Sequence, residues 1–361
     1  MARAERLQII NQLENQRTKV ISYITGDRQG FETKIAFDVV PLLYRHLQRI
    51  GKTETIMLFL YSTGGLTMAG WRIVTLIREF CDKFVVLIPY KAQSCATLIA
   101  LGADEIIMGP IGQLSPVDPT VITPYNPPAP AQMPGAAQTL LPVSVEDVIS
   151  YLNLAKDEAK LGQPEELKEV FLRLTASVNP LALGNVHRAR SQIRMLAEKL
   201  LKSHMKGRNI DKKISNIVSI LTEKLFSHDY LISRKEAKNI LGSIVKEPNQ
   251  EMERLMWNLF QDYSQEIELG QIFNPNIFLG DQNEREFQLN RAFVESSYGI
   301  HIFRTRKVIR RRQITGQMPG QVMPGFINQP IQTEIIEERI LQEEWVEEGW
   351  QQEENRGGNI A

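Results

Sequence analysis

The segment "KFVVLIPYKAQSCATLIALGADEIIMG" (83–109) decides the fold class of this chain. It begins with an apolar run of the length of a buried strand, continues with an Ala-rich stretch typical of a helix, and ends with the short apolar run "EIIMG" (105–109). The segment before it has the same order, with "TIMLFLY" (55–61), a turn at "STGG" and the helical pattern "LTMAGWRIVTLIREF" (66–80). Strands that alternate with helices at this spacing predict an α/β fold with a mostly parallel sheet.

The same alternation extends to both sides of these segments. "KVISYIT" (19–25) predicts a strand, and "IAFDVVPLLYRHLQRIG" (35–51) has apolar residues at helical spacing. Further helices are expected at 144–160, 185–205, 211–226 and 233–245. We therefore expect a main domain over residues 1–246, which a Pro-rich and uncharged loop interrupts at 121–143.

The character of the sequence changes at about residue 247. An amphipathic helical pattern is followed by alternating stretches typical of strands, so we expect a helix and a β-hairpin as a C-terminal extension over 247–346. The basic run 304–312 and the acidic run 334–344 can pair as antiparallel neighbours, because opposite charges across two strands stabilise them. Residues 347–361 are predicted to be a disordered tail.

Composition excludes several classes of protein. Lys+Arg and Asp+Glu are equal at 42 each, so the overall charge predicts no nucleic-acid partner. The two cysteines, Cys81 and Cys95, give no disulfide framework and fit a reducing compartment. No run approaches the roughly 18 apolar residues of a spanning helix. We expect a cytoplasmic protein without a transmembrane segment, and no cluster with ligand spacing predicts a metal or cofactor.

Two stretches follow predicted strands and can carry chemistry. In "YSTGG" (61–65), Gly64 and Gly65 can aim backbone N–H groups at an anion or a developing oxyanion, or can simply form a tight turn. In "KAQSCA" (91–96), Ser94 heads an apolar helix, where it is either an exposed nucleophile or a helix cap. Cys95 can donate its backbone N–H, and packing is the expected role of its thiol because no cation lies next to it.

Taken together, "YSTGGLTMAG", "KAQSCATLIALGADEI" and "GPIGQLSPVDP" resemble the Clp-protease/crotonase superfamily. Within it, the chain is most similar to the serine dehydrogenase proteinases, a prokaryotic group related to Clp proteolytic subunits and signal peptide peptidase A. The resemblance covers about residues 18–246. It implies the spiral ββα fold of that superfamily, with Ser94 as nucleophile and the N–H groups of Gly65 and Cys95 as the oxyanion hole. The turn with Gly64 would hold the substrate in extended form.

The resemblance also implies a general base. The order Ser, Asp, His described for the group fits Ser94, Asp118 of "SPVDP" and His228 of "SHDY". In the Clp subunits a His follows the nucleophile and an Asp comes later, so the position of Asp118 corresponds to that of a His there. Signal peptide peptidases use a Lys base, for which Lys156 of "NLAKDEAK" is the alternative.

The resulting functional hypothesis is a serine peptidase that acts on peptides or proteins without a cofactor. By likeness to the superfamily we also expect a homo-oligomer. Two alternatives from other classes stay open: a scaffold or interaction protein that kept the fold and lost hydrolysis, and crotonase-like acyl-CoA chemistry, which uses the same oxyanion hole without a nucleophilic serine.

Overall fold

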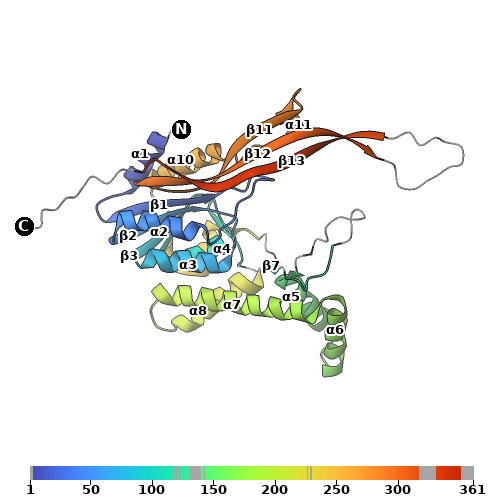
Figure 1. The fold of residues 1–361 in the computed structure, drawn as a ribbon. Helices are drawn as coiled ribbons and strands as arrows, with labels where there is room; N and C mark the ends of the chain where they lie inside the picture. Colours follow the sequence, from blue (N-terminus) through green and yellow to red (C-terminus); the bar gives the residue numbers. More distant parts are fainter. Residues whose placement is uncertain are drawn as a thin grey trace, which may run out of the picture.

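The computed structural model describes residues 3–117, 120–121, 123–129, 140–141, 143–225, 227, 230–316 and 331–350 (Figure 1). These residues form one large sheet with the strand order β10-β5-β3-β2-β1-β11-β12-β13. Its strands are β1 (Thr18–Thr25), β2 (Thr53–Tyr61), β3 (Cys81–Ile88), β5 (Glu105–Met108), β10 (Val245–Lys246), β11 (Glu284–Ser296), β12 (Gly299–Gly316) and β13 (Ile331–Glu348). Strands β10 to β1 run parallel, which confirms the α/β class with a mostly parallel sheet.

Two small sheets and a set of helices complete the described fold. The small sheets consist of β4 (Lys91–Ala92), β6 (Gln113–Leu114) and β9 (Ile232–Ser233), and of β7 (Thr120–Val121) and β8 (Val143–Ser144). The α-helices are α1 (Arg3–Leu13), α2 (Val39–Ile50), α3 (Thr67–Arg78), α4 (Cys95–Leu101), α5 (Val145–Asn153), α6 (Pro164–Ser177), α7 (Pro180–His204), α8 (Ile210–Ser219), α9 (Arg234–Leu241), α10 (Gln250–Glu266) and α11 (Pro275–Leu279). Short π turns, η1 (Leu154–Glu158) and η2 (Ile220–Lys224), and the 3₁₀ turn η3 (Gly242–Ile244) follow α5, α8 and α9.

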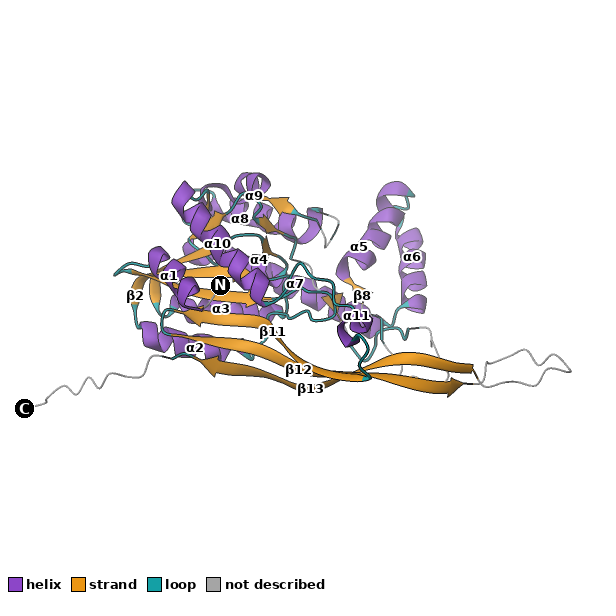
Figure 2. Ribbon diagram, turned by 90° about the horizontal axis from the view of Figure 1, so that it is seen from above, coloured by secondary structure: helices purple, strands orange, loops and turns teal. Residues whose placement is uncertain are grey.

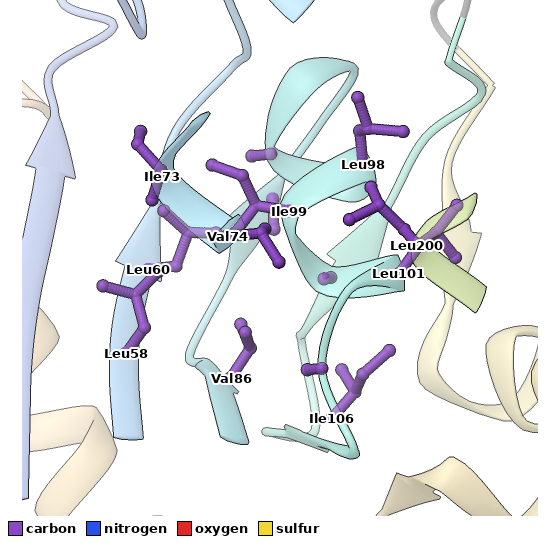
Figure 3. Close-up of a cluster of buried hydrophobic side chains, with 14 of the residues drawn as sticks. Leu58, Leu60, Ile73, Val74, Val86, Leu98, Ile99, Leu101, Ile106 and Leu200 are labelled. Atoms are coloured by element: carbon purple, nitrogen blue, oxygen red, sulfur yellow. The ribbon is translucent and has the colours of Figure 1, made fainter. Parts of the chain in front are cut away.

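The C-terminal parts of β2 and β3 are continuously apolar, from Ile56 and Phe84 onward, because helices cover both faces of the sheet there. Leu58 and Leu60 of β2 face one core, which α2, α3, α4 and α7 also line, whereas Phe59 and Tyr61 face a second core lined by α1 and α10. Figure 3 shows the first core, where side chains of α3 and α4 pack against those of β2 and β3. Every residue of α4 is buried, so this packing fixes the start of the helix at Cys95.

The C-terminal strands join the main sheet. β11 pairs antiparallel with β1, and β12 lies between β11 and β13 (Figure 2). The basic and acidic runs pair as predicted, with ion pairs that include Arg311–Glu334 at 3.2 Å and Arg312–Glu337 at 2.8 Å. The predicted antiparallel pairing is therefore confirmed. The far ends of these strands project beyond the parallel part of the sheet (Figure 1).

The boundary that we predicted at residue 346 requires a correction. β13 continues to Glu348, and Trp350 packs against two buried histidines, His46 and His301, with ring centroids 4.9 and 5.3 Å away. Two contacts hold these residues against the fold. The Trp350 ring covers the histidine pair, and Glu347 forms an ion pair with Arg45 at 2.8 Å. Residues 351–361 of the predicted tail lie outside the described residues.

Candidate active site

Ser94 joins β4 to α4 in an unusual backbone conformation. Its φ of 51° and ψ of −114° place it on the side of the Ramachandran map that non-glycine residues rarely adopt. Such a conformation costs about 1–3 kcal/mol and persists only where the surroundings enforce it. Ser94 occupies the N-cap position of α4, but among the described residues its side chain accepts no capping hydrogen bond from the helix, which leaves the hydroxyl available for another role.

The "STGG" turn after β2 lies directly against Ser94. A methyl group placed on Gly64 would lie 2.7 Å from the Cβ and 3.2 Å from the Oγ of Ser94. At Gly65 the chain approaches Ile35 so closely that a Cβ would lie 2.2 Å from the Ile35 carbonyl oxygen. The φ values of Gly64 and Gly65, 104° and 154°, are also ones that residues with a side chain rarely adopt. Both the close contacts and the backbone conformation therefore require glycine at these positions.

Hydrogen bonds fix this turn from both ends. The Ile35 N–H donates to the Gly64 carbonyl at 2.9 Å, and the Leu66 N–H donates to the Ile35 carbonyl at 2.8 Å. The Gly64 N–H donates to the Ser62 hydroxyl, at 3.0 Å. Within the described chain, neither the Gly65 N–H nor the Cys95 N–H donates a hydrogen bond to a protein acceptor. The N–H groups of Gly65 and Cys95, the residues that follow Gly64 and Ser94, are thus available to a group bound beside the Ser94 hydroxyl.

The thiol of Cys95 points into the protein interior. It is 1% exposed, donates to the Leu66 carbonyl at 3.2 Å, and packs so closely on Gly70 that a Cβ there would lie 2.5 Å from the sulfur. Burial raises the pKa of the Cys95 thiol to about 12, which keeps it protonated at neutral pH. Only the backbone of Cys95 is therefore suited to the chemistry of this site.

Asp118 and His228 lie outside the described residues, but the strands beside them are described. β6 ends four residues before Asp118, and β9 begins four residues after His228. β6 pairs with both β4 and β9, through the residue pairs Ala92–Leu114 and Leu114–Ile232. One three-stranded sheet thus connects a strand that precedes Ser94, a strand that precedes Asp118 and a strand that follows His228.

The lysine alternatives are placed differently. The side chain of Lys156 is exposed on η1, which packs mainly against α5 and α6. Lys91, three residues before Ser94, forms an ion pair with Asp27 at 2.6 Å, and the Tyr61 hydroxyl donates to the same carboxylate at 2.7 Å. In the described chain, neither lysine contacts Ser94.

His46, His204 and His301 have partners away from Ser94, and the side chain of His187 is exposed on α7. His46 and His301 face each other, with 3.0 Å between their ring nitrogens, and His46 contacts the Ser296 hydroxyl at 2.7 Å. His204 contacts the carbonyl of Leu101, at the opposite end of α4 from Ser94, with 2.9 Å between the atoms.

Sequence reasoning missed four hydroxyl residues that hold the two turns in place. The Ser94 N–H donates to the Ser115 hydroxyl at 2.8 Å, and Ser115 is in turn bonded to Thr97. On the other side, the Thr25 hydroxyl donates to that of Ser62 at 2.8 Å. Their signal in the sequence is a small hydroxyl residue within or directly after an otherwise apolar run, as in "SCATLIAL" (94–101).

The N-terminal part of the chain matches a known family. Residues 1–139 match the family model of ClpP-like SDH-type serine proteinases, which confirms the resemblance inferred from the sequence motifs. The matched range includes the double-glycine turn, Ser94, Cys95 and Asp118, and it ends before Lys156 and His228. The similarity to the ClpP-like SDH-type serine proteinases therefore covers the N-terminal 139 residues of the chain.

Two uncharacterized proteins of Methanocaldococcus jannaschii are similar in sequence. MJ1495 is 26% identical over 270 residues, which cover 72% of this chain and 77% of the relative. MJ0137 is 24% identical over 242 residues, which cover 65% of this chain and 71% of the relative.

Similar solved structures include two of a membrane-bound stomatin-specific protease, 1510-N, each a point mutant and one in complex with a substrate peptide. They are 14% and 16% identical, cover 66% and 69% of this chain and 83% and 82% of theirs, and have TM-scores of 0.36. A ClpP1 mutant from Listeria monocytogenes is 16% identical, with a TM-score of 0.33 and coverage of 70% and 99%. Among the described residues of the present chain, no helix is both long and apolar enough to cross a membrane.

Proposed function

We propose that this protein is a serine peptidase, which cleaves peptide bonds through an acyl-enzyme on Ser94. The observation that carries the proposal is the conformation of Ser94: a non-glycine residue with a φ of 51° at the start of a buried helix, next to a double-glycine turn. A backbone conformation of this cost is retained where it presents a reactive group. The match of residues 1–139 to a serine proteinase family supports the same role.

The chemistry follows from the groups around Ser94. The Oγ attacks the carbonyl carbon of the scissile peptide bond, and the carbonyl oxygen becomes an oxyanion. The N–H groups of Gly65 and Cys95, which have no protein acceptor in the described chain, stabilise it, while Gly64 leaves room for the substrate backbone. One such donor typically contributes about 10²- to 10³-fold to the rate. The amine then leaves, and water hydrolyses the ester.

A general base must take the proton of the Ser94 hydroxyl and return it to the leaving amine. We assign this role to His228, with Asp118 as the residue that orients it. The pairing of β6 with β4 and β9 supports this assignment, because each of the three positions lies within four residues of one of these strands. Lys156 remains the alternative; its exposure argues against it, since a lysine base must be desolvated to be neutral.

We extend the proposal to peptide or protein substrates and to a homo-oligomeric assembly. The substrate class follows from the serine proteinase family that residues 1–139 match, and the assembly from the likeness of the sequence motifs to the Clp-protease/crotonase superfamily. Size-exclusion chromatography with light scattering measures the assembly directly: a mass equal to the 41.2 kDa of one chain would refute the oligomer and leave the peptidase assignment untouched.

A fluorophosphonate probe tests the nucleophile. We expect labelling of the wild type and of Cys95→Ala, which keeps the backbone N–H, and no labelling of Ser94→Ala. A folded wild type that does not react would refute the peptidase. In that case, turnover of an acyl-CoA would favour crotonase-like chemistry, and its absence would favour a scaffold.

The same probe decides the base. We expect His228→Ala and Asp118→Asn to label much more slowly than the wild type, and Lys156→Ala to label at the wild-type rate. Loss of labelling in the lysine variant alone would contradict the Ser94–His228–Asp118 triad.

A further inference from the structure

The backbone of Ser94 is held by a part-buried hydrogen bond to a serine of another segment. The Ser94 N–H donates to the Ser115 Oγ at 2.8 Å, and the Ser115 hydroxyl donates to the Pro116 carbonyl at 3.0 Å. Ser115 is 1% exposed, so its hydroxyl relies on protein partners rather than on water. The Ser115 side chain therefore uses its hydrogen and one lone pair to hold two backbone groups.

Ser115 is itself held from α4. Its N–H donates to the Thr97 Oγ1 at 3.1 Å, and the Thr97 hydroxyl donates to the Ala92 carbonyl at 2.8 Å. Thr97 is fully buried. Because Ala92 lies on β4 and pairs with Leu114 on β6, these bonds close a ring around the turn that carries Ser94.

We propose that Ser115 is a positioning residue for the nucleophile, which fixes the backbone of Ser94 and thereby the direction of its hydroxyl, and that Thr97 orients Ser115. This inference rests on the proposed function, since positioning has a kinetic consequence only if Ser94 reacts. Without the Ser115 hydroxyl, the Ser94 N–H loses its acceptor in the described chain, and the turn relaxes toward an ordinary conformation with negative φ. The hydroxyl of Ser94 then points away from the oxyanion donors.

The consequence is a change in reactivity that a purely structural role would not produce. In Ser115→Ala we expect the maximal labelling rate with a fluorophosphonate to fall about 10- to 100-fold, with little change in the probe concentration at half saturation. Thr97→Val, which keeps the shape and removes the hydroxyl, should give a smaller loss, and Thr97→Ser should restore the rate. Labelling of folded Ser115→Ala within twofold of the wild-type rate would overturn the proposal.

A matched control separates positioning from general destabilisation. Ser296 is also a buried serine, and its hydroxyl contacts His46 at 2.7 Å in another part of the fold. Ser296→Ala should lower the urea midpoint of unfolding and leave the labelling rate unchanged. An equal loss of labelling in both variants would overturn the positioning role of Ser115.

A crystal structure of Ser115→Ala tests the inference independently of activity. We expect the φ of residue 94 to become negative. A φ that stays near its wild-type value of 51° would refute the positioning role, whatever the labelling shows. If the wild type does not label at all, the proposed function fails, and the conformation of residue 94 still decides whether Ser115 holds it.

Discussion

Replacing Gly64 with alanine tests how closely the double-glycine turn lies against the nucleophile. A Cβ at residue 64 would lie 2.7 Å from the Cβ of Ser94 and 3.0 Å from the carbonyl oxygen of Gln93, and the residue has a φ of 104°. The backbone conformation alone costs about 1–3 kcal/mol for a residue with a side chain. The overpacking adds about 1–3 kcal/mol, because either Ser94 or the turn must move.

Gly51→Ala is the matched control for this change. Gly51 has a φ of 73°, and a Cβ there would meet no atom within 4 Å, so only the conformational cost of about 1–3 kcal/mol applies. We expect urea unfolding to show a loss of stability for Gly64→Ala that exceeds the loss for Gly51→Ala by about 1–3 kcal/mol. Fluorophosphonate labelling should fall strongly in Gly64→Ala and stay at the wild-type rate in Gly51→Ala. Equal losses of stability together with unchanged labelling in Gly64→Ala would refute the packing of this turn on Ser94.

Three further predictions concern buried ionisable groups. Burial lowers the pKa of His46 to about 3, so the stability that the neutral imidazole contributes above pH 6.5 is lost as the pH falls, by about 1.4 kcal/mol per pH unit. Urea unfolding at pH 7.5 and at pH 5.0 should therefore show a loss of stability between the two that is about 2 kcal/mol smaller in His46→Gln than in the wild type. Identical losses in the two proteins would contradict this. The thiol of Cys95 should resist iodoacetamide at pH 8 until the protein is unfolded in urea, whereas alkylation of the folded protein would contradict its burial. Arg6→Met should lower the free energy of unfolding by about 3–5 kcal/mol, because Arg6 pairs with the buried carboxylates of Asp262 and Glu295; a loss below about 1 kcal/mol would show that the pairs do not matter.

The parallel half of the sheet could be predicted because its strands have a recognisable local sequence pattern. The apolar runs at 55–61 and 83–90 correspond to β2 and β3, since a strand covered on both faces must be apolar throughout. Two adjacent glycines after a strand, here Gly64 and Gly65, indicate a tight turn or a close approach of the backbone to another group. Ser94 at the start of α4 could also be singled out from the local sequence, because it follows a predicted strand and precedes an apolar helical pattern.

Other features depend on contacts between distant parts of the chain. The pairing of β11 with β1, for example Phe293 with Ile24, joins segments about three quarters of the chain apart, and no local periodicity encodes it. The conformation of Ser94 depends on Ser115, which looks like an ordinary serine before a proline. The pairing of β12 with β13 could be predicted, because opposite charges make both strands recognisable.

Mapping the fluorophosphonate adduct by peptide mass spectrometry tests the central claim most directly. The account predicts a single adduct on the hydroxyl of Ser94 and none on the adjacent Cys95. An adduct on another residue, or a folded and unmodified Ser94 after exposure to excess probe, would contradict it.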